Sequence, residues 1–302
     1  MIVVAGGSGT LGRLVVDDLL RRGEAVRVLV RDAARARAVL GGAVDVMSGD
    51  VRKPTGLEYA LAGAETVVSA VHGFLGGRGG GPTEVDERGN ANLVDAAAAA
   101  GASVVLVSVV GAAPDSPADL FRAKYAAEQH LRASGTDWTI VRAGPFLETW
   151  LTVLTQTAGA SGRPLVFGRG EQPIPFVSAL DVAAAVSRAA IDPALRGHVL
   201  EIAGQSLTMT ELAQALQASQ NWHSSPRHLP RALLRVLGVV ARPLNPAFAR
   251  QNKTALAMDT GRLTGPTAPG ALSPPQHTLP DVLGVSALSG KSGCSASRRA
   301  IY

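Results

Sequence analysis

The fold is decided near the start of the chain, where residues 2–12 read IVVAGGSGTLG. The apolar run at residues 2–5 predicts a buried strand, and Gly6, Gly9 and Gly12 follow it with the spacing GxxGxxG. Glycine is needed there because the chain turns sharply, and a Cβ atom would keep the backbone N–H groups away from a pyrophosphate. The helix that follows adds the partial positive charge of its N-terminus. The stretch therefore predicts the strand, phosphate-binding turn and helix that open a dinucleotide-binding Rossmann fold.

The alternation of strand and helix continues to residue 145. Short β-branched runs predict further strands at residues 25–30, 44–47, 66–70, 104–107 and 138–141, with helices at 10–22, 33–40, 85–100 and 118–133. Strands that are apolar along their whole length indicate a parallel sheet covered on both faces. Right-handed crossovers then give the doubly wound order. We predict an α/β fold in which residues 1–145 form a Rossmann-type doubly wound parallel sheet.

The pattern changes beyond residue 145. We expect a short extended segment at 173–177, a strand at 199–203, and helices at 179–191, 208–218 and 231–241. Residues 146–260 are therefore predicted to form a small C-terminal α/β substrate region. Residues 261–302 are rich in Gly, Pro, Ser and Thr, a composition typical of a loosely ordered tail.

Charge and composition exclude several classes of function. Seven of the 29 Lys and Arg residues, but only two of the 24 Asp and Glu residues, lie after residue 241. The preceding part is neutral, which argues against a nucleic-acid partner. One cysteine, Cys294, and six scattered histidines give no metal-binding spacing. We see no leader peptide and no apolar run of the ~18–20 residues that span a membrane, so we expect a cytoplasmic protein without a membrane partner.

Two side chains after the second strand distinguish the two nicotinamide cofactors. Arg31 would pair with the 2′-phosphate of NADP, whereas Asp32 would hold the 2′-hydroxyl of NAD. Because Arg31 comes first and other arginines follow it, we favour NADP and keep NAD as the alternative. Asp50, after the third strand, either accepts a hydrogen bond from the adenine ring or binds its own turn. His72, beside the fourth strand, is a further candidate for the lining of the pocket.

In their order, these segments resemble the atypical short-chain dehydrogenase/reductases, and within them the NmrA-like branch of NAD(P)-binding proteins. The matching stretches are residues 4–12, 28–32, 49–51, 90–101, 107–112, 124–131, 134–142 and 178–183. The resemblance implies a Rossmann domain, a small substrate domain, and a nicotinamide pocket formed partly by residues after the sixth strand. The predicted cofactor-binding residues are Gly6, Gly7, Ser8, Gly9, Thr10, Leu11, Gly12, Arg31, Asp50, Val51, Ser69, Ala70, Val71, Lys124, Gly144, Pro145 and Phe146.

The Tyr/Lys pair of the wider superfamily is incomplete in this chain. Lys124 matches the lysine, but Leu120 stands four residues earlier, where a proton-carrying tyrosine is expected. Tyr125 is the neighbour of Lys124 and does not share its helix face. We therefore predict Lys124 and Ser108 as the catalytic residues, with a water molecule that relays the proton. The alternative for Lys124 is a solvated helix lysine.

These features predict an NAD(P)-dependent oxidoreductase that transfers a hydride between NADP(H) and a small apolar carbonyl or quinone-like substrate. Phe146, Trp150, Phe167 and Phe176 suggest an apolar pocket, and we expect a monomer or homodimer. One alternative is a non-catalytic NAD(P)-binding redox sensor or regulatory protein, which the missing tyrosine favours. A nucleotide-sugar epimerase-like enzyme ranks third because it would need the intact Tyr/Lys pair.

Overall fold

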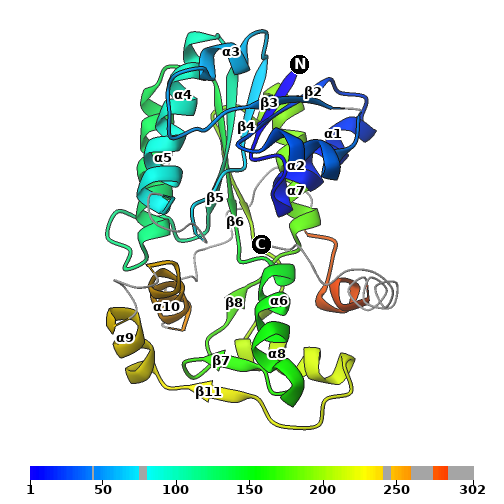
Figure 1. The fold of residues 1–302 in the computed structure, drawn as a ribbon, viewed down its shortest axis with the longest axis vertical. Helices are drawn as coiled ribbons and strands as arrows, with labels where there is room; N and C mark the ends of the chain where they lie inside the picture. The colour runs from blue at the N-terminus through cyan, green and yellow to red at the C-terminus, as the bar shows by residue number, and fades with distance from the viewer. Residues whose placement is uncertain (43, 75–79, 241–245, 260–274, 285–302) are drawn as a thin grey trace.

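A parallel sheet forms the centre of the molecule (Figure 1). The computed structural model describes residues 1–42, 44–74, 80–240, 246–259 and 275–284. Within this part of the chain the sheet has seven strands in the order β3-β2-β1-β4-β5-β6-β9, all parallel. Their bounds are β1 Ile2–Ala5, β2 Val26–Val30, β3 Asp45–Ser48, β4 Thr66–Ser69, β5 Ser103–Val109, β6 Trp138–Ala143 and β9 Val199–Ile202. The strand order confirms the doubly wound α/β fold.

Helices cover both faces of the sheet, as the fully apolar strands predict. They are α1 Thr10–Arg21, α2 Ala33–Leu40, α3 Leu57–Leu61, η1 Thr83–Gly89, α4 Asn90–Ala99, α5 Asp119–Ala133 and α7 Ala179–Ile191, with a short turn η3 at Pro193–Leu195. Alternate side chains of each strand pack into different cores: Val4 and Val28 lie with α1 and α7. Val3 and Leu106 lie on the other face with α3, α4 and α5. Figure 1 shows these two helix layers on opposite sides of the sheet.

The remaining elements form a smaller unit below the carboxyl ends of the strands (Figure 1). They are α6 Leu147–Ala158, η2 Gly159–Ser161, β7 Leu165–Phe167, β8 Ile174–Pro175, β10 Ser206–Leu207, α8 Met209–Ser219, β11 Arg227–Leu229, α9 Arg231–Val240 and α10 Pro246–Met258. We call these elements the C-terminal unit. Its core also includes Ala118 and Phe121 from the start of α5, so the unit packs directly against the Rossmann part.

Residues 146–260 do not form one continuous unit. After β8 the chain returns to the sheet, where α7 packs against α1 and β9 pairs with β6. It then crosses back to form β10 and α8. A boundary at residue 145 therefore marks only the place where the chain first leaves the sheet. The later elements α7 and β9 belong to the Rossmann part.

Part of the predicted tail is ordered. Residues 260–274 and 285–302 lie outside the described residues, but residues 279–284 form a helical turn. Leu279 and Val282 are buried in the core of the C-terminal unit. Asp181, in the first turn of α7, accepts hydrogen bonds from the backbone N of Gln276 at 3.1 Å and of His277 at 3.0 Å. The expectation of a loosely ordered tail is wrong for residues 275–284, because their apolar side chains pack into the core of the C-terminal unit.

Candidate cofactor and active site

The glycine loop lies where the direction of strand addition reverses. The chain passes from β1 to β2 and β3 on one side and from β4 to β5 and β6 on the other. In such sheets the crevice beyond the carboxyl ends of the two central strands is the usual place for a ligand. Here these strands are β1, which leads into the glycine loop, and β4, which leads to Ala70 and Val71. The fold therefore brings the predicted loop and the predicted β4 residues together.

The turn between β1 and α1 has no room for side chains at two of its glycines. Gly6 has a φ of +82°, and a Cβ atom there would lie 2.9 Å from Ala70 O. A Cβ atom at Gly12 would lie 2.2 Å from Gly6 O. The backbone is thus folded tightly on itself, as a turn that cradles a phosphate requires.

The N-terminus of α1 is open for an anion. Gly9 caps the helix without a side-chain hydrogen bond, and the first turn contains no acidic residue. Ser8, Gly9 and Thr10 are exposed, whereas Leu11 and Gly12 are buried. The helix N-terminus therefore keeps its N–H groups and its partial positive charge for a ligand. These features fit the pyrophosphate of a dinucleotide.

Arg31 and Asp32 have different surroundings after β2. The Asp32 carboxylate accepts a hydrogen bond from the Arg35 backbone N at 2.9 Å and caps α2. Arg31 is exposed, and its side chain has no ion-pair or hydrogen-bond partner among the described residues. Asp32 is thus engaged as a helix cap, while the Arg31 guanidinium is available to an incoming group.

Asp50 binds its own turn, the second of its two predicted roles. Its carboxylate accepts hydrogen bonds from the backbone N of Arg52 at 3.0 Å and from Arg52 Nε at 2.9 Å, and it also pairs with Arg52 Nη2. Hydrogen bonding to Arg52 lowers the pKa of the Asp50 carboxyl. Val51 is buried, and its carbonyl accepts a hydrogen bond from Asn92 Nδ2 at 2.9 Å. Both residues hold the loop after β3 in place.

Ser69, Ala70 and Val71 differ in accessibility at the end of β4. Ser69 is buried, and its hydroxyl donates to Asn90 Oδ1 at 2.5 Å. Asn90 in turn donates to Asp86 O at 2.7 Å. Ala70 and Val71 are half-buried and pack on Gly6, so the backbone rather than the Ser69 hydroxyl faces the glycine loop.

Lys124 is buried and bonded to the protein. Its Nζ donates to Val71 O at 3.1 Å and to Val107 O at 2.9 Å, and it lies 3.1 Å from Asp86 Oδ1. Two of the three N–H donors of the ammonium group are used in these hydrogen bonds, and Asp86 Oδ1 is its ion-pair partner. Asp86 is fully buried, and its Oδ2 accepts a hydrogen bond from Gly73 N at 2.7 Å. Lys124 thus ties together the ends of β4 and β5 and the π-helix η1.

Ser108 is also engaged by the protein. It is buried at the end of β5, and its hydroxyl donates to Glu128 Oε1 at 2.5 Å. Glu128, one turn after Lys124 on α5, also accepts from Arg142 Nε at 2.9 Å and Nη2 at 2.6 Å. Hydrogen bonding to Glu128 raises the pKa of the Arg142 guanidinium. Glu128 was not identified as a site residue from the sequence. Its position among the apolar residues of α5 indicated that it lies on the buried face of the helix.

His72 is the exposed side chain of the β4 end. It follows Val71 and precedes Gly73, and its ring has no hydrogen-bond partner among the described residues. Many protein atoms lie around its ring although solvent reaches it. The pKa of the imidazole is lowered mainly by this desolvation. The positive charges of Lys124 and Arg31 lower it further, whereas the negative charge of Asp86 raises it.

Gly144, Pro145 and Phe146 form the first connection between the sheet and the C-terminal unit. A Cβ atom at Gly144 would lie 2.2 Å from Pro175 O, and Pro145 O accepts a hydrogen bond from Val177 N at 3.0 Å. Phe146 is half-buried. The segment is held close to the strand ends by backbone contacts.

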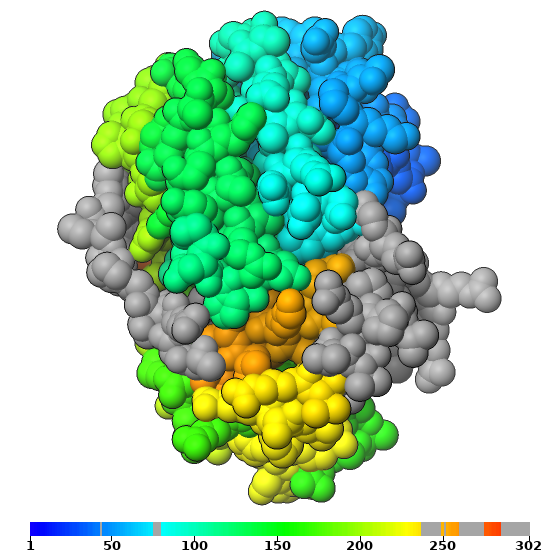
Figure 2. Space-filling view, turned by 90° about the vertical axis from the view of Figure 1, so that its left-hand side faces the viewer, coloured from blue at the N-terminus to red at the C-terminus, as the bar shows by residue number. Residues whose placement is uncertain are grey.

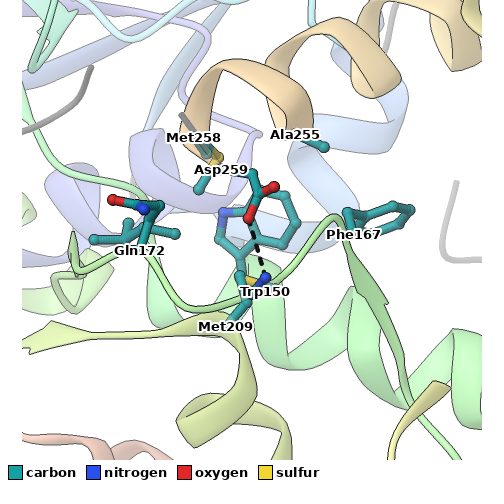
Figure 3. Close-up of a pocket in the computed structure, with 9 residues that line it drawn as sticks. Trp150, Phe167, Gln172, Met209, Ala255, Met258 and Asp259 are labelled. Atoms are coloured by element: carbon teal, nitrogen blue, oxygen red, sulfur yellow. Dashed lines mark hydrogen bonds between the residues drawn. The ribbon is translucent and has the colours of Figure 1, made fainter. Parts of the chain in front are cut away.

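Three of the four aromatic residues predicted to line an apolar pocket, Trp150, Phe167 and Phe176, pack within the C-terminal unit, whereas Phe146 packs against the core below α1 and α7. Trp150 and Phe167 meet edge to face with ring centroids 6.4 Å apart, and Phe176 is completely buried. Figure 3 shows Trp150 and Phe167 with Met209, Met258 and Asp259. The Asp259 carboxylate accepts a hydrogen bond from the backbone N of Gly170 at 3.0 Å. The space left between these residues is about 10 Å³, which admits about one water molecule. The expectation of an apolar substrate pocket at these aromatics is wrong, because Trp150, Phe167 and Phe176 pack within the C-terminal unit and leave little space between them.

A larger cavity lies at the carboxyl edge of the sheet. It has a volume of about 230 Å³ between the β5–α5 loop and α10. Its lining residues are Gly111, Ala113, Asp115, Ser116, Pro117, Phe121 and Ala257. In Figure 2, α10 (orange) lies between the Rossmann part and α9 (yellow). This cavity is therefore bordered by both parts of the molecule.

Comparison with known proteins agrees with this geometry. The family model described as NAD(P)H-binding matches residues 6–193. The NAD(P)H azoreductase of Xenophilus azovorans is 34% identical over 221 residues, which cover 72% of this chain and 73% of the relative. Quinone oxidoreductase 2 of Escherichia coli is 28% identical over 221 residues, with the same coverage.

Solved structures show the same fold over nearly the whole chain. An NADPH-dependent quinone oxidoreductase from Escherichia coli, complexed with NADPH, superposes with a TM-score of 0.78 at 25% identity and covers 95% of this chain and 100% of its own. The triphenylmethane reductase of Citrobacter sp., complexed with NADP(H), gives a TM-score of 0.73 at 21% identity and covers 94% and 99%. The chain belongs to the NAD(P)H-binding family, and its resemblance to the atypical short-chain dehydrogenase/reductases is confirmed. Among the described residues, no helix has the length and apolar character needed to cross a membrane.

Proposed function

We propose that this protein is an NADPH-dependent oxidoreductase that reduces small quinone-like substrates. The observation that carries the proposal is the glycine loop at the β1/β4 crevice, with the N-terminus of α1 uncapped beside it. The relatives named as azoreductase and quinone oxidoreductase support a reductase. A nicotinamide supplies a hydride when bound, and the protein supplies binding and orientation.

Arg31 supports NADPH over NADH as the preferred cofactor. The neighbouring carboxylate, Asp32, caps α2 and is thereby occupied, while Arg31 remains exposed. A guanidinium at this position pairs well with a 2′-phosphate, which NADH lacks. Gly6–Gly12 and the β4 end would hold the pyrophosphate, with residues 144–146 on the nicotinamide side.

The cavity between the β5–α5 loop and α10 is the best candidate for the substrate site. It lies at the same edge of the sheet as the glycine loop, and its wall combines Phe121 and Pro117 with the polar Asp115 and Ser116. A flat carbonyl compound needs this combination of apolar surface and a few polar groups. We also expect a monomer or homodimer in the cytoplasm.

Calorimetric titration with NADPH and NADH tests the cofactor preference. Arg31→Ala should weaken NADPH binding by about tenfold, the loss of one charge-assisted contact, and should leave NADH binding unchanged. Arg21→Ala removes the same charge at the opposite end of α1 and should bind both nucleotides like the wild type. If neither nucleotide binds the wild type, the proposal is wrong.

Reduction of quinones and azo dyes by the loaded protein tests the reaction. Oxidation of NADPH that depends on such an acceptor supports the reductase. Tight NADPH binding without reduction of any acceptor would instead favour a cofactor-binding regulatory protein.

A further inference from the structure

His72 stands apart from the other polar groups near the glycine loop. Ser69, Asp86 and Lys124 are buried, and each is bonded within the protein: Ser69 to the Asn90 side chain, Asp86 and Lys124 to backbone groups. His72 is exposed and has no hydrogen-bond partner among the described residues. It is therefore the titratable side chain of this segment that can meet a ligand.

The backbone on both sides of His72 is held by one buried ion pair. Lys124 Nζ binds the carbonyl of Val71, the residue before it, and Asp86 Oδ2 binds the backbone N of Gly73, the residue after it. Lys124 and Asp86 also face each other at 3.1 Å. Asp86 lies on a π-helix, a geometry that is rare and often found at functional sites. This arrangement fixes the peptide while the imidazole stays open to solvent.

The segment that carries His72 borders the phosphate-binding turn. A Cβ atom at Gly6 would lie 2.9 Å from Ala70 O and 3.2 Å from Val71 N, so the chain at the end of β4 touches the glycine loop. Among the described residues, the charged groups that act on the imidazole are Asp86 from η1, Lys124 from α5 and Arg31 after β2. Because Asp86 and Lys124 neutralise each other, Arg31 and the helix N-terminus leave a positive field that attracts an anion.

We infer that His72 is a proton-linked ligand of the cofactor's diphosphate, so that binding of the dinucleotide takes up a proton. The inference rests on the proposed cofactor binding and extends it to a residue outside the glycine motif. In the unliganded protein, desolvation, Lys124 and Arg31 favour the neutral ring. A diphosphate beside the ring favours the imidazolium, whose two N–H groups both donate.

The sign of the pH dependence follows from this linkage. A histidine whose pKa rises on binding strengthens the complex below its pKa in the free protein. That contribution is lost as the pH rises through its pKa in the complex. Cofactor affinity should therefore decrease as the pH rises from about 5 to 8. The 2′-phosphate of NADPH titrates near the same range, so NADH, which lacks this group, is the cleaner probe.

Calorimetry with NADH in two buffers of different ionisation enthalpy tests the inference. The wild type should take up on the order of half a proton near the midpoint of the titration. His72→Gln, which keeps a donor but carries no charge, should take up none, and below about pH 6 it should bind NADH about three- to tenfold more weakly than the wild type. His228→Gln, at an exposed position on β11 of the C-terminal unit, should behave like the wild type.

Three results separate the possible failures. Equal proton uptake by the wild type and His72→Gln overturns the inference and leaves the proposed function intact. A pH dependence of turnover at saturating cofactor, without one in affinity, also overturns it and places His72 at the substrate instead. Binding of neither nucleotide by the wild type overturns the proposed function, and this inference with it.

Discussion

Gly12 sets the tightest steric limit in the glycine loop. An ideal Cβ atom at this position would lie 2.2 Å from Gly6 O and 2.8 Å from Gly7 Cα. Both neighbours are backbone atoms, so a rotamer change cannot relieve the contact. A side chain there must push α1 away from the end of β1, and the backbone N–H groups move with it.

Gly12→Ala should therefore impair both stability and cofactor binding. We expect a loss of about 1–3 kcal/mol in the free energy of unfolding, as for other overpacked sites, measured by urea denaturation. NADPH affinity should fall by about tenfold or more. Gly42→Ala is the matched control, because a Cβ atom there meets nothing within 4 Å, and it should leave both quantities unchanged. Equal stability of the two variants would contradict the steric argument.

At the scale of elements, β4, η1 and α5 are joined by charges that the sheet alone would not bring together. Lys124 and Glu128 are both buried one turn apart on α5. Lys124 reaches Asp86 on η1, and Glu128 reaches Ser108 on β5 and Arg142 on β6. A charge buried without a partner is costly, whereas a bonded pair is tolerated. The two pairs therefore fix the carboxyl edge of the sheet.

Lys124→Met tests the first of these pairs. Loss of the ammonium leaves the buried Asp86 carboxylate with Gly73 N as its hydrogen-bond partner among the described residues, and breaking such a pair costs about 3–5 kcal/mol. The double variant Lys124→Met/Asp86→Asn removes the stranded charge while its amide oxygen can still accept from Gly73 N. Denaturation should show the double variant to be more stable than Lys124→Met alone. If the double variant were less stable than Lys124→Met, the unpaired Asp86 charge would not be the cause of the lost stability.

The elements that the sequence predicted correctly are those with a local signal. The strands of the sheet are apolar runs, and α8 begins with the capping box of Thr208 and Glu211. The short helix α3, the strands β7 and β11, and the helices α6 and α10 were missed because no motif or strong apolar run marks them. The partners of Lys124 and Ser108 were missed for another reason: they come from separate elements, and no spacing in the chain encodes them. A lysine and a glutamate on an otherwise apolar helix face were the available sign that both are buried and paired.

At the scale of the whole molecule, the chain crosses repeatedly between the sheet and the C-terminal unit. Glu148, in the first turn of α6, accepts hydrogen bonds from Ser178 Oγ at 2.6 Å and Ala179 N at 3.0 Å, and so caps α7. Asp259, after α10, accepts from the backbone N of Arg169 at 3.1 Å and Gly170 at 3.0 Å and pairs with Arg231. The Glu148 contacts hold the C-terminal unit to α7 beside the sheet, and the Asp259 contacts join separate elements within that unit.

The segment 275–284 makes the last of these connections. It bonds to Asp181 of α7 through its backbone and His277 Nδ1, and it places Leu279 in the core of the C-terminal unit. Leu279→Ala should therefore lower the free energy of unfolding by about 2–3 kcal/mol, since Leu279 is only 6% exposed. Leu233→Ala, on α9 with 43% exposure, removes the same atoms and should cost less than about 0.5 kcal/mol. Urea denaturation of both variants compares them directly. Equal stability of the two would show that this segment does not contribute to the folded core. A larger loss for Leu279→Ala would show that residues far beyond the Rossmann part stabilise the unit that closes the site.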